Sequence, residues 1–120
     1  MSLIESALSS YAVNAYHDSE GYWKVQGIVL PGMKEYEIRE RKLTKETVSK
    51  IFFYREGEND GNEWIIVGKM INDDYFSFQA SCDYTGFCCR GGGEIVFAPS
   101  SESLRERGLP IDVPENISLD

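Results

Sequence analysis

The chain has 120 residues, of which 42% are hydrophobic and 27% are charged, a composition typical of one globular domain and not of a disordered or fibrous protein. Its net charge of −8 repels phosphate backbones and anionic lipid, so we expect neither a nucleic-acid nor a membrane partner. The sequence shows neither a secretory leader nor an apolar run long enough to cross a bilayer, and we expect a soluble, cytoplasmic protein.

The first segment carries the pattern of an amphipathic helix. Ser2 and Glu5 have the spacing of a capping box, and apolar residues recur at helical intervals as far as Tyr16. This pattern predicts a single helix over residues 3–16.

Two alternating segments flank the dipeptide Pro31-Gly32, which is suited to the two central positions of a type II turn. Apolar residues alternate with polar ones over 22–30, and 34–41 alternates with a charged outer side. We therefore expect these segments to pair as a β-hairpin.

The next stretch, 44–55, fits two structures. Thr44 is a suitable helix cap, but the dense aromatic and β-branched run that follows favours a strand from about Ser49. A polar connection over 56–63 then leads to a strand-like segment, 64–71, so a second hairpin is predicted.

Residues 75–82 show the clearest strand pattern in the chain, with Phe76 and Phe78 on one side and serine and glutamine on the other. A glycine-rich loop over 82–93 should follow, and then a short strand over 94–98.

Ser100 or Ser101 is expected to cap a helix that ends near Gly108. The last segment, 109–120, has two prolines and only acidic charges, and we expect an extended acidic tail on the surface. The predicted fold is one α+β domain over 1–120, with an antiparallel, meander-like sheet of five or six strands, an N-terminal helix and a short C-terminal helix.

The stretch CDYTGFCCRGGG, Cys82 to Gly93, holds all three cysteines and three consecutive glycines. Its aromatic residues are suited to anchoring a partner, and its arginine and glycine amides are suited to binding an anion. The candidate binding residues are Asp83, Tyr84, Phe87, Cys88, Cys89, Arg90, Gly91, Gly92 and Gly93.

The cysteine spacing does not match a metal site. Cys82 stands five residues before the adjacent pair Cys88-Cys89, and the single histidine, His17, lies far upstream. We therefore predict no metal and no cofactor, and the odd cysteine count argues against a disulfide framework.

Two other loop motifs are incomplete. Gly92 and Gly93 stand where a phosphate-binding loop needs lysine and a hydroxyl residue, and the acidic segment 56–61 lacks the glutamate that a calcium loop needs, because Val67 occupies that position.

Each catalytic or metal motif considered lacks an essential group, so the sequence favours a noncatalytic interaction or regulatory domain that binds a protein partner, and a basic one by charge complementarity. The alternative is a small enzyme or ligand-binding protein that uses a cysteine thiolate, Arg90 and glycine amides of the Cys82–Gly93 loop. A third hypothesis, an acidic mimic of nucleic acid, is disfavoured by the net positive segment 34–55. The oligomeric state is left open.

Overall fold

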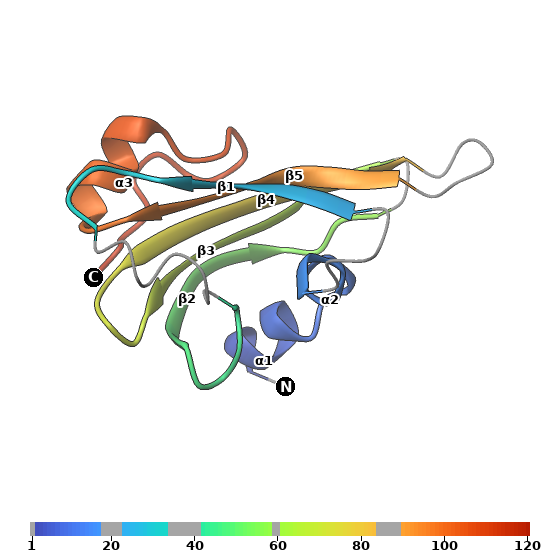
Figure 1. The fold of residues 1–120 in the computed structure, drawn as a ribbon, viewed down its shortest axis with the longest axis horizontal. Helices are drawn as coiled ribbons and strands as arrows, with labels where there is room; N and C mark the ends of the chain where they lie inside the picture. The colour runs from blue at the N-terminus through green and yellow to red at the C-terminus, as the bar shows by residue number, and fades with distance from the viewer. Residues whose placement is uncertain (1, 18–22, 34–41, 59–60, 84–89) are drawn as a thin grey trace.

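A computed structural model describes residues 2–17, 23–33, 42–58, 61–83 and 90–120. A five-stranded sheet lies between two layers (Figure 1). Helices α1 and α2 pack on one face of the sheet, and helix α3 with the C-terminal segment packs on the other. Within the described ranges, no helix is long and apolar enough to cross a membrane.

The described part of the chain begins with two helices, continues with five strands and ends with a third helix. In chain order they are α1 (Leu3–Leu8), α2 (Tyr11–His17), β1 (Trp23–Val29), β2 (Val48–Arg55), β3 (Trp64–Met70), β4 (Tyr75–Asp83), β5 (Arg90–Ala98) and α3 (Ser101–Arg107). The predicted α+β class is confirmed.

The sheet is mixed, with the strand order β1-β5-β4-β3-β2. The pairs β2–β3, β3–β4 and β4–β5 are antiparallel, but β1 pairs with β5 in parallel. The predicted meander is therefore wrong for β1, because local alternation does not specify which distant strand lies alongside. The predicted hairpin partner of β1, residues 34–41, lies outside the described residues.

The predicted N-terminal helix is divided into α1 and α2. The capping contact at its start is confirmed, because the Ser2 hydroxyl accepts a hydrogen bond from the Glu5 N–H at 3.2 Å. At the break, the Ser9 hydroxyl donates to the Glu5 carbonyl at 2.7 Å, and the Ser10 hydroxyl accepts from the Val13 N–H at 3.4 Å. These serines bind the backbone at the end of one helix and the start of the next, where a continuous helix was expected.

The ambiguous segment 44–55 forms a strand, as favoured. Residues 45–47 make a turn, and β2 begins at Val48. The predicted hairpin of β2 with β3 and the predicted strand at β4 are both confirmed.

Strand β5 begins earlier than predicted. Its bounds, Arg90–Ala98, include the three glycines that were expected to lie in the preceding loop. Gly91 pairs with Cys82 and Gly92 with Ser81 on β4. A Cβ atom on Gly93 would lie 1.9 Å from the Gln79 carbonyl oxygen, so glycine here permits a close approach of the two strands.

Helix α3 has the predicted ends. The Ser100 hydroxyl accepts a hydrogen bond from the Ser103 N–H at 3.2 Å, and Gly108 ends the helix with a φ angle of 106°, a conformation that glycine adopts readily.

The two sheet faces carry separate apolar clusters. The face toward α1 and α2 buries large side chains such as Phe76 and Phe78, and the opposite face buries Ile65, Val67 and Val96. This division follows from the alternation of side chains along each strand.

The C-terminal segment is more than a surface tail. Val113 and Leu119 are buried in the second cluster, and the Arg55 guanidinium forms a 2.6 Å ion pair with Asp112. The segment 109–120 covers apolar rows of the sheet that α3 is too short to cover alone, which its proline-rich, acidic sequence did not indicate.

His17 ties α2 to the chain before β2, because its Nε2 atom accepts a hydrogen bond from the Leu43 N–H at 3.0 Å. Partial burial, and then the positive charge of Lys42, lower the pKa of His17 below its ordinary value of 6.5. The neutral imidazole is the form that can accept this bond.

We expect stability to fall as the pH drops below about 6.5, where the unfolded chain takes up a proton that the native His17 resists. The loss should continue until the native imidazole is itself protonated. Urea unfolding between pH 5 and pH 8 checks this, with His17→Gln as the matched variant, because the glutamine carbonyl accepts the same bond without titrating. Identical pH profiles for the two proteins would contradict the assignment.

Candidate binding surface

Much of the predicted loop lies outside the described residues. This holds for Tyr84, Phe87, Cys88 and Cys89. Asp83 is the last residue of β4 and Arg90 the first of β5, and the strand register pairs them directly. The roles proposed from sequence for these residues stay predictions.

Four residues of the predicted loop, Cys82 and the three glycines, have described positions in the sheet. Cys82 is 4% exposed and belongs to the cluster under α1 and α2, which is the core position expected of a structural cysteine. Gly91, Gly92 and Gly93 lie between β1 and β4 in the ladders of a central strand. Their backbones therefore face the neighbouring strands of the sheet.

The strand register brings together polar residues on the other face of the sheet. Ser77, Gln79 and Ser81 alternate with Phe76 and Phe78, so these three polar side chains point away from α1 and α2. On β5, Glu94 pairs with Gln79 and Gly92 pairs with Ser81. Just before β3, Glu63 completes the group. We name this surface the polar shelf: Glu63, Ser77, Gln79, Ser81, Gly92 and Glu94.

Helix α3 and the C-terminal segment cover the neighbouring apolar rows but leave hollows over the polar shelf. One depression of about 240 Å³ is lined by Glu63, Gln79, Ser81, Gly92 and Glu94, among others. A second, of about 300 Å³, is lined by Ser77, Gln79 and Glu94 together with Arg107 and residues 108–111. Because Gln79 and Glu94 line both, the depressions adjoin.

Two polar contacts organise the polar shelf. The Gln79 amide Nε2 donates a hydrogen bond to a carboxylate oxygen of Glu63. Glu94 lies 3.8 Å from the Arg107 guanidinium, and both side chains are more than two-fifths exposed. An exposed pair at this distance is weak, so the Glu94 carboxylate is available to a competing cation.

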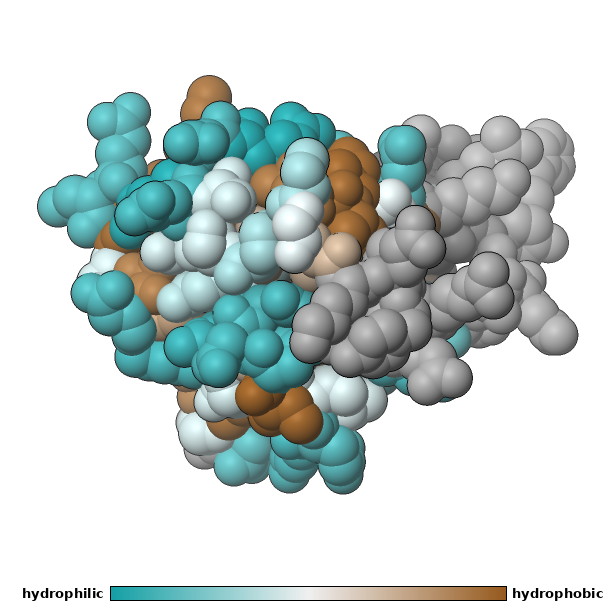
Figure 2. All heavy atoms as spheres, turned by 60° about the vertical axis from the view of Figure 1, so that its left-hand side comes forward, coloured by the Kyte–Doolittle hydropathy of each residue, from teal (hydrophilic) through white to brown (hydrophobic). Residues whose placement is uncertain are grey.

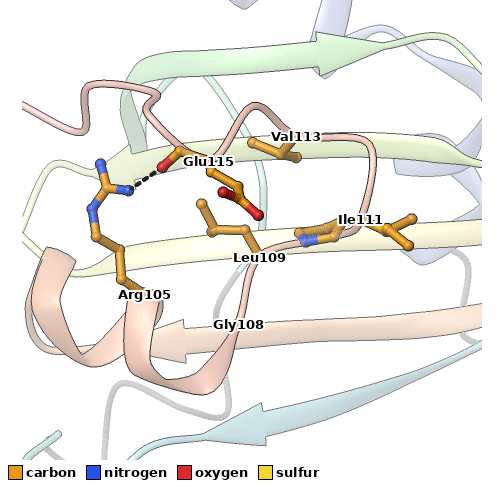
Figure 3. A pocket seen from close by; sticks show the side chains of 7 residues that line it. Arg105, Gly108, Leu109, Ile111, Val113 and Glu115 are labelled. Carbon is orange, nitrogen blue, oxygen red and sulfur yellow. Dashed lines mark hydrogen bonds between the residues drawn. The ribbon is translucent and has the colours of Figure 1, made fainter.

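A third depression, of about 570 Å³, is lined by residues 108–111 together with Arg105, Val113 and Glu115 (Figure 3). Arg105 donates a hydrogen bond to the Glu115 carbonyl oxygen at 3.3 Å across it. Leu109 and Val113 form its apolar part, whereas Ile111 projects away from them. Ile111 is 93% exposed and lines both this depression and the 300 Å³ depression of the polar shelf.

The surface is chemically suited to polar recognition. Among the described residues, no three histidine, cysteine, aspartate or glutamate side chains converge to hold a metal ion.

Comparison of the chain with protein-family models, with curated proteins and with solved structures finds no match.

The sequence alone places Ser77, Gln79 and Ser81 on one side of a strand but does not identify them as a binding surface. The available signal was the uninterrupted polar alternation opposite buried aromatic residues. Glu63 and Glu94 could not be added, because strand pairing brings them there from distant positions.

Proposed function

We propose that this chain is a noncatalytic interaction domain that binds a segment of a protein partner on the polar shelf. The observation that carries the proposal is the partial covering of one sheet face: its apolar rows lie under α3 and the C-terminal segment, and its polar rows open into adjoining depressions. Amides, hydroxyls and carboxylates in such depressions offer the donors and acceptors that a polypeptide segment needs.

The arrangement of nucleophiles and bases supports a noncatalytic role. Cys82 faces the core on the opposite side of the sheet, and His17 is engaged with the Leu43 backbone on that same side. Within the described ranges, neither residue lines the polar shelf depressions, so a thiolate paired with an imidazole has no support there.

The surface chemistry also fits a polar partner. On the side shown in Figure 2, the coloured apolar residues form separate patches between hydrophilic ones. Recognition through such a surface depends on hydrogen bonds and charge in addition to apolar contact.

Peptides that bind the wild-type protein can be selected from a random displayed library. We expect these peptides to bind the Ser81→Trp variant at least about tenfold more weakly. Ser81 is exposed, so tryptophan there fills the 240 Å³ depression with little effect on the core. The matched control is Asn14→Trp, an exposed residue of α2 on the opposite sheet face.

Fluorescence anisotropy with the selected peptides measures the effect, and circular dichroism verifies that both variants are folded. Selection of no peptide, or equal binding to all three proteins, would refute the proposed function.

A further inference from the structure

The polar shelf has an unequal charge balance. Glu63 and Glu94 contribute two carboxylates to its depressions. Of the cations beside them, Arg107 is held weakly to Glu94, and Arg55, which donates to the Glu63 backbone carbonyl, is paired with Asp112. The whole chain carries a net charge of −8. A cationic side chain entering the 240 Å³ depression therefore meets a local and a long-range field of favourable sign.

A neutral polar residue, Ser77, also belongs to this surface. Ser77 is 4% exposed, it alternates with buried phenylalanines, and it lines the 300 Å³ depression. A hydroxyl in this position can donate a hydrogen bond to, or accept one from, a polar group of an occupant.

Apolar residues border the polar shelf. Leu109, Pro110 and Ile111 line the 300 Å³ depression together with Glu94 and Arg107. Ile111 is almost wholly exposed, whereas Leu109 and Pro110 are half-buried. An aliphatic side chain of a partner can contact these apolar residues while a neighbouring cation reaches the carboxylates.

We infer that the partner segment is an extended, basic peptide in which an aliphatic residue precedes or follows an arginine or lysine by one intervening residue. This inference rests on the proposed function and specifies its partner. In an extended chain, alternate side chains point the same way about 7 Å apart, which suits two adjoining depressions that share Gln79 and Glu94. The basic side chain binds between Glu63 and Glu94, and the aliphatic one packs on Ile111.

The probe is a synthetic peptide of glycine and serine in which a leucine and an arginine are separated by one residue. Isothermal titration calorimetry measures its affinity for the protein. We expect Glu63→Gln and Glu94→Gln each to weaken its binding about fivefold, Ile111→Ser to weaken it by a similar factor, and added salt to weaken it further. Glu46→Gln, an exposed residue outside the polar shelf, removes the same charge and should leave the affinity unchanged.

Two comparison peptides separate the contributions. Replacing arginine by glutamate should abolish measurable binding, and replacing leucine by glycine should weaken it about fivefold. Equal binding of the arginine and glutamate peptides, or no effect of either carboxylate substitution, would overturn the inference.

Failure of the inference is distinguishable from failure of the proposed function. If the library peptides lose binding to the Ser81→Trp variant but contain no basic residues, the proposed interaction domain is supported and the inference of a basic partner is wrong. If sedimentation shows a dimer of the chain that Ser81→Trp dissociates, a second copy covers the polar shelf and the inference is also wrong.

Discussion

Replacing Leu119 by alanine should lower the free energy of unfolding by about 3 kcal/mol. The Leu119 side chain is 2% exposed and packs in the cluster with Ile65 and Val67, so the substitution leaves a cavity between the C-terminal segment and the sheet. Because a domain of this size is stable by only about 5–15 kcal/mol, urea unfolding followed by circular dichroism resolves this loss easily.

The matched control for this substitution is Ile111→Ala in the same segment. Ile111 is 93% exposed, and its truncation should change the free energy of unfolding by less than about 0.5 kcal/mol. An equally small effect of Leu119→Ala would show that the segment 109–120 is the loose tail that its sequence suggests.

Replacing Gly93 by alanine should destabilise the fold by about 3 kcal/mol, at the upper end of the usual cost of overpacking. The added Cβ atom would lie 1.9 Å from the Gln79 carbonyl oxygen and 2.7 Å from the Ala80 Cα atom. Both contacts are with backbone, so β4 and β5 would have to move apart and strain their shared ladder.

Gly27→Ala is the control, because a Cβ atom on that glycine of β1 meets nothing within 4 Å. Alanine there should be neutral or slightly stabilising, since it restricts the unfolded chain. Thermal unfolding of the two variants compares them directly. Similar melting temperatures would mean that β4 and β5 do not approach as closely at Gly93 as the structure shows.

Local chemistry in the sequence was sufficient for several elements. The Ser2 and Ser100 hydroxyls cap helices, and each accepts a hydrogen bond from an N–H only three residues further along the chain. Such a contact depends on a few neighbouring residues, so the sequence can predict it. The alternation in β4 likewise predicts that Phe76 is buried and that Gln79 faces the other way. The break between α1 and α2 was not predicted, because the helical periodicity of the surrounding residues favoured one continuous helix through Ser9 and Ser10.

The candidate surface was predictable only in part for the same reason. The polar side of β4 follows from its own sequence, whereas Glu63 and Glu94 reach the polar shelf through pairing with strands on either side. The predicted loop drew attention to Gly91, Gly92 and Gly93 as flexible residues, yet glycines between two strands can be required by close packing instead.

The sequence by itself determined which residues share a face, where most elements begin and end, and that the chain is one acidic α+β domain, because these properties depend on neighbouring residues and overall composition. Tertiary structure decided that β1 lies parallel to β5, that Leu119 belongs to the core, and that the polar shelf stays open beside α3. These outcomes depend on contacts between segments far apart in the chain, and local periodicity carries no information about which segments will meet.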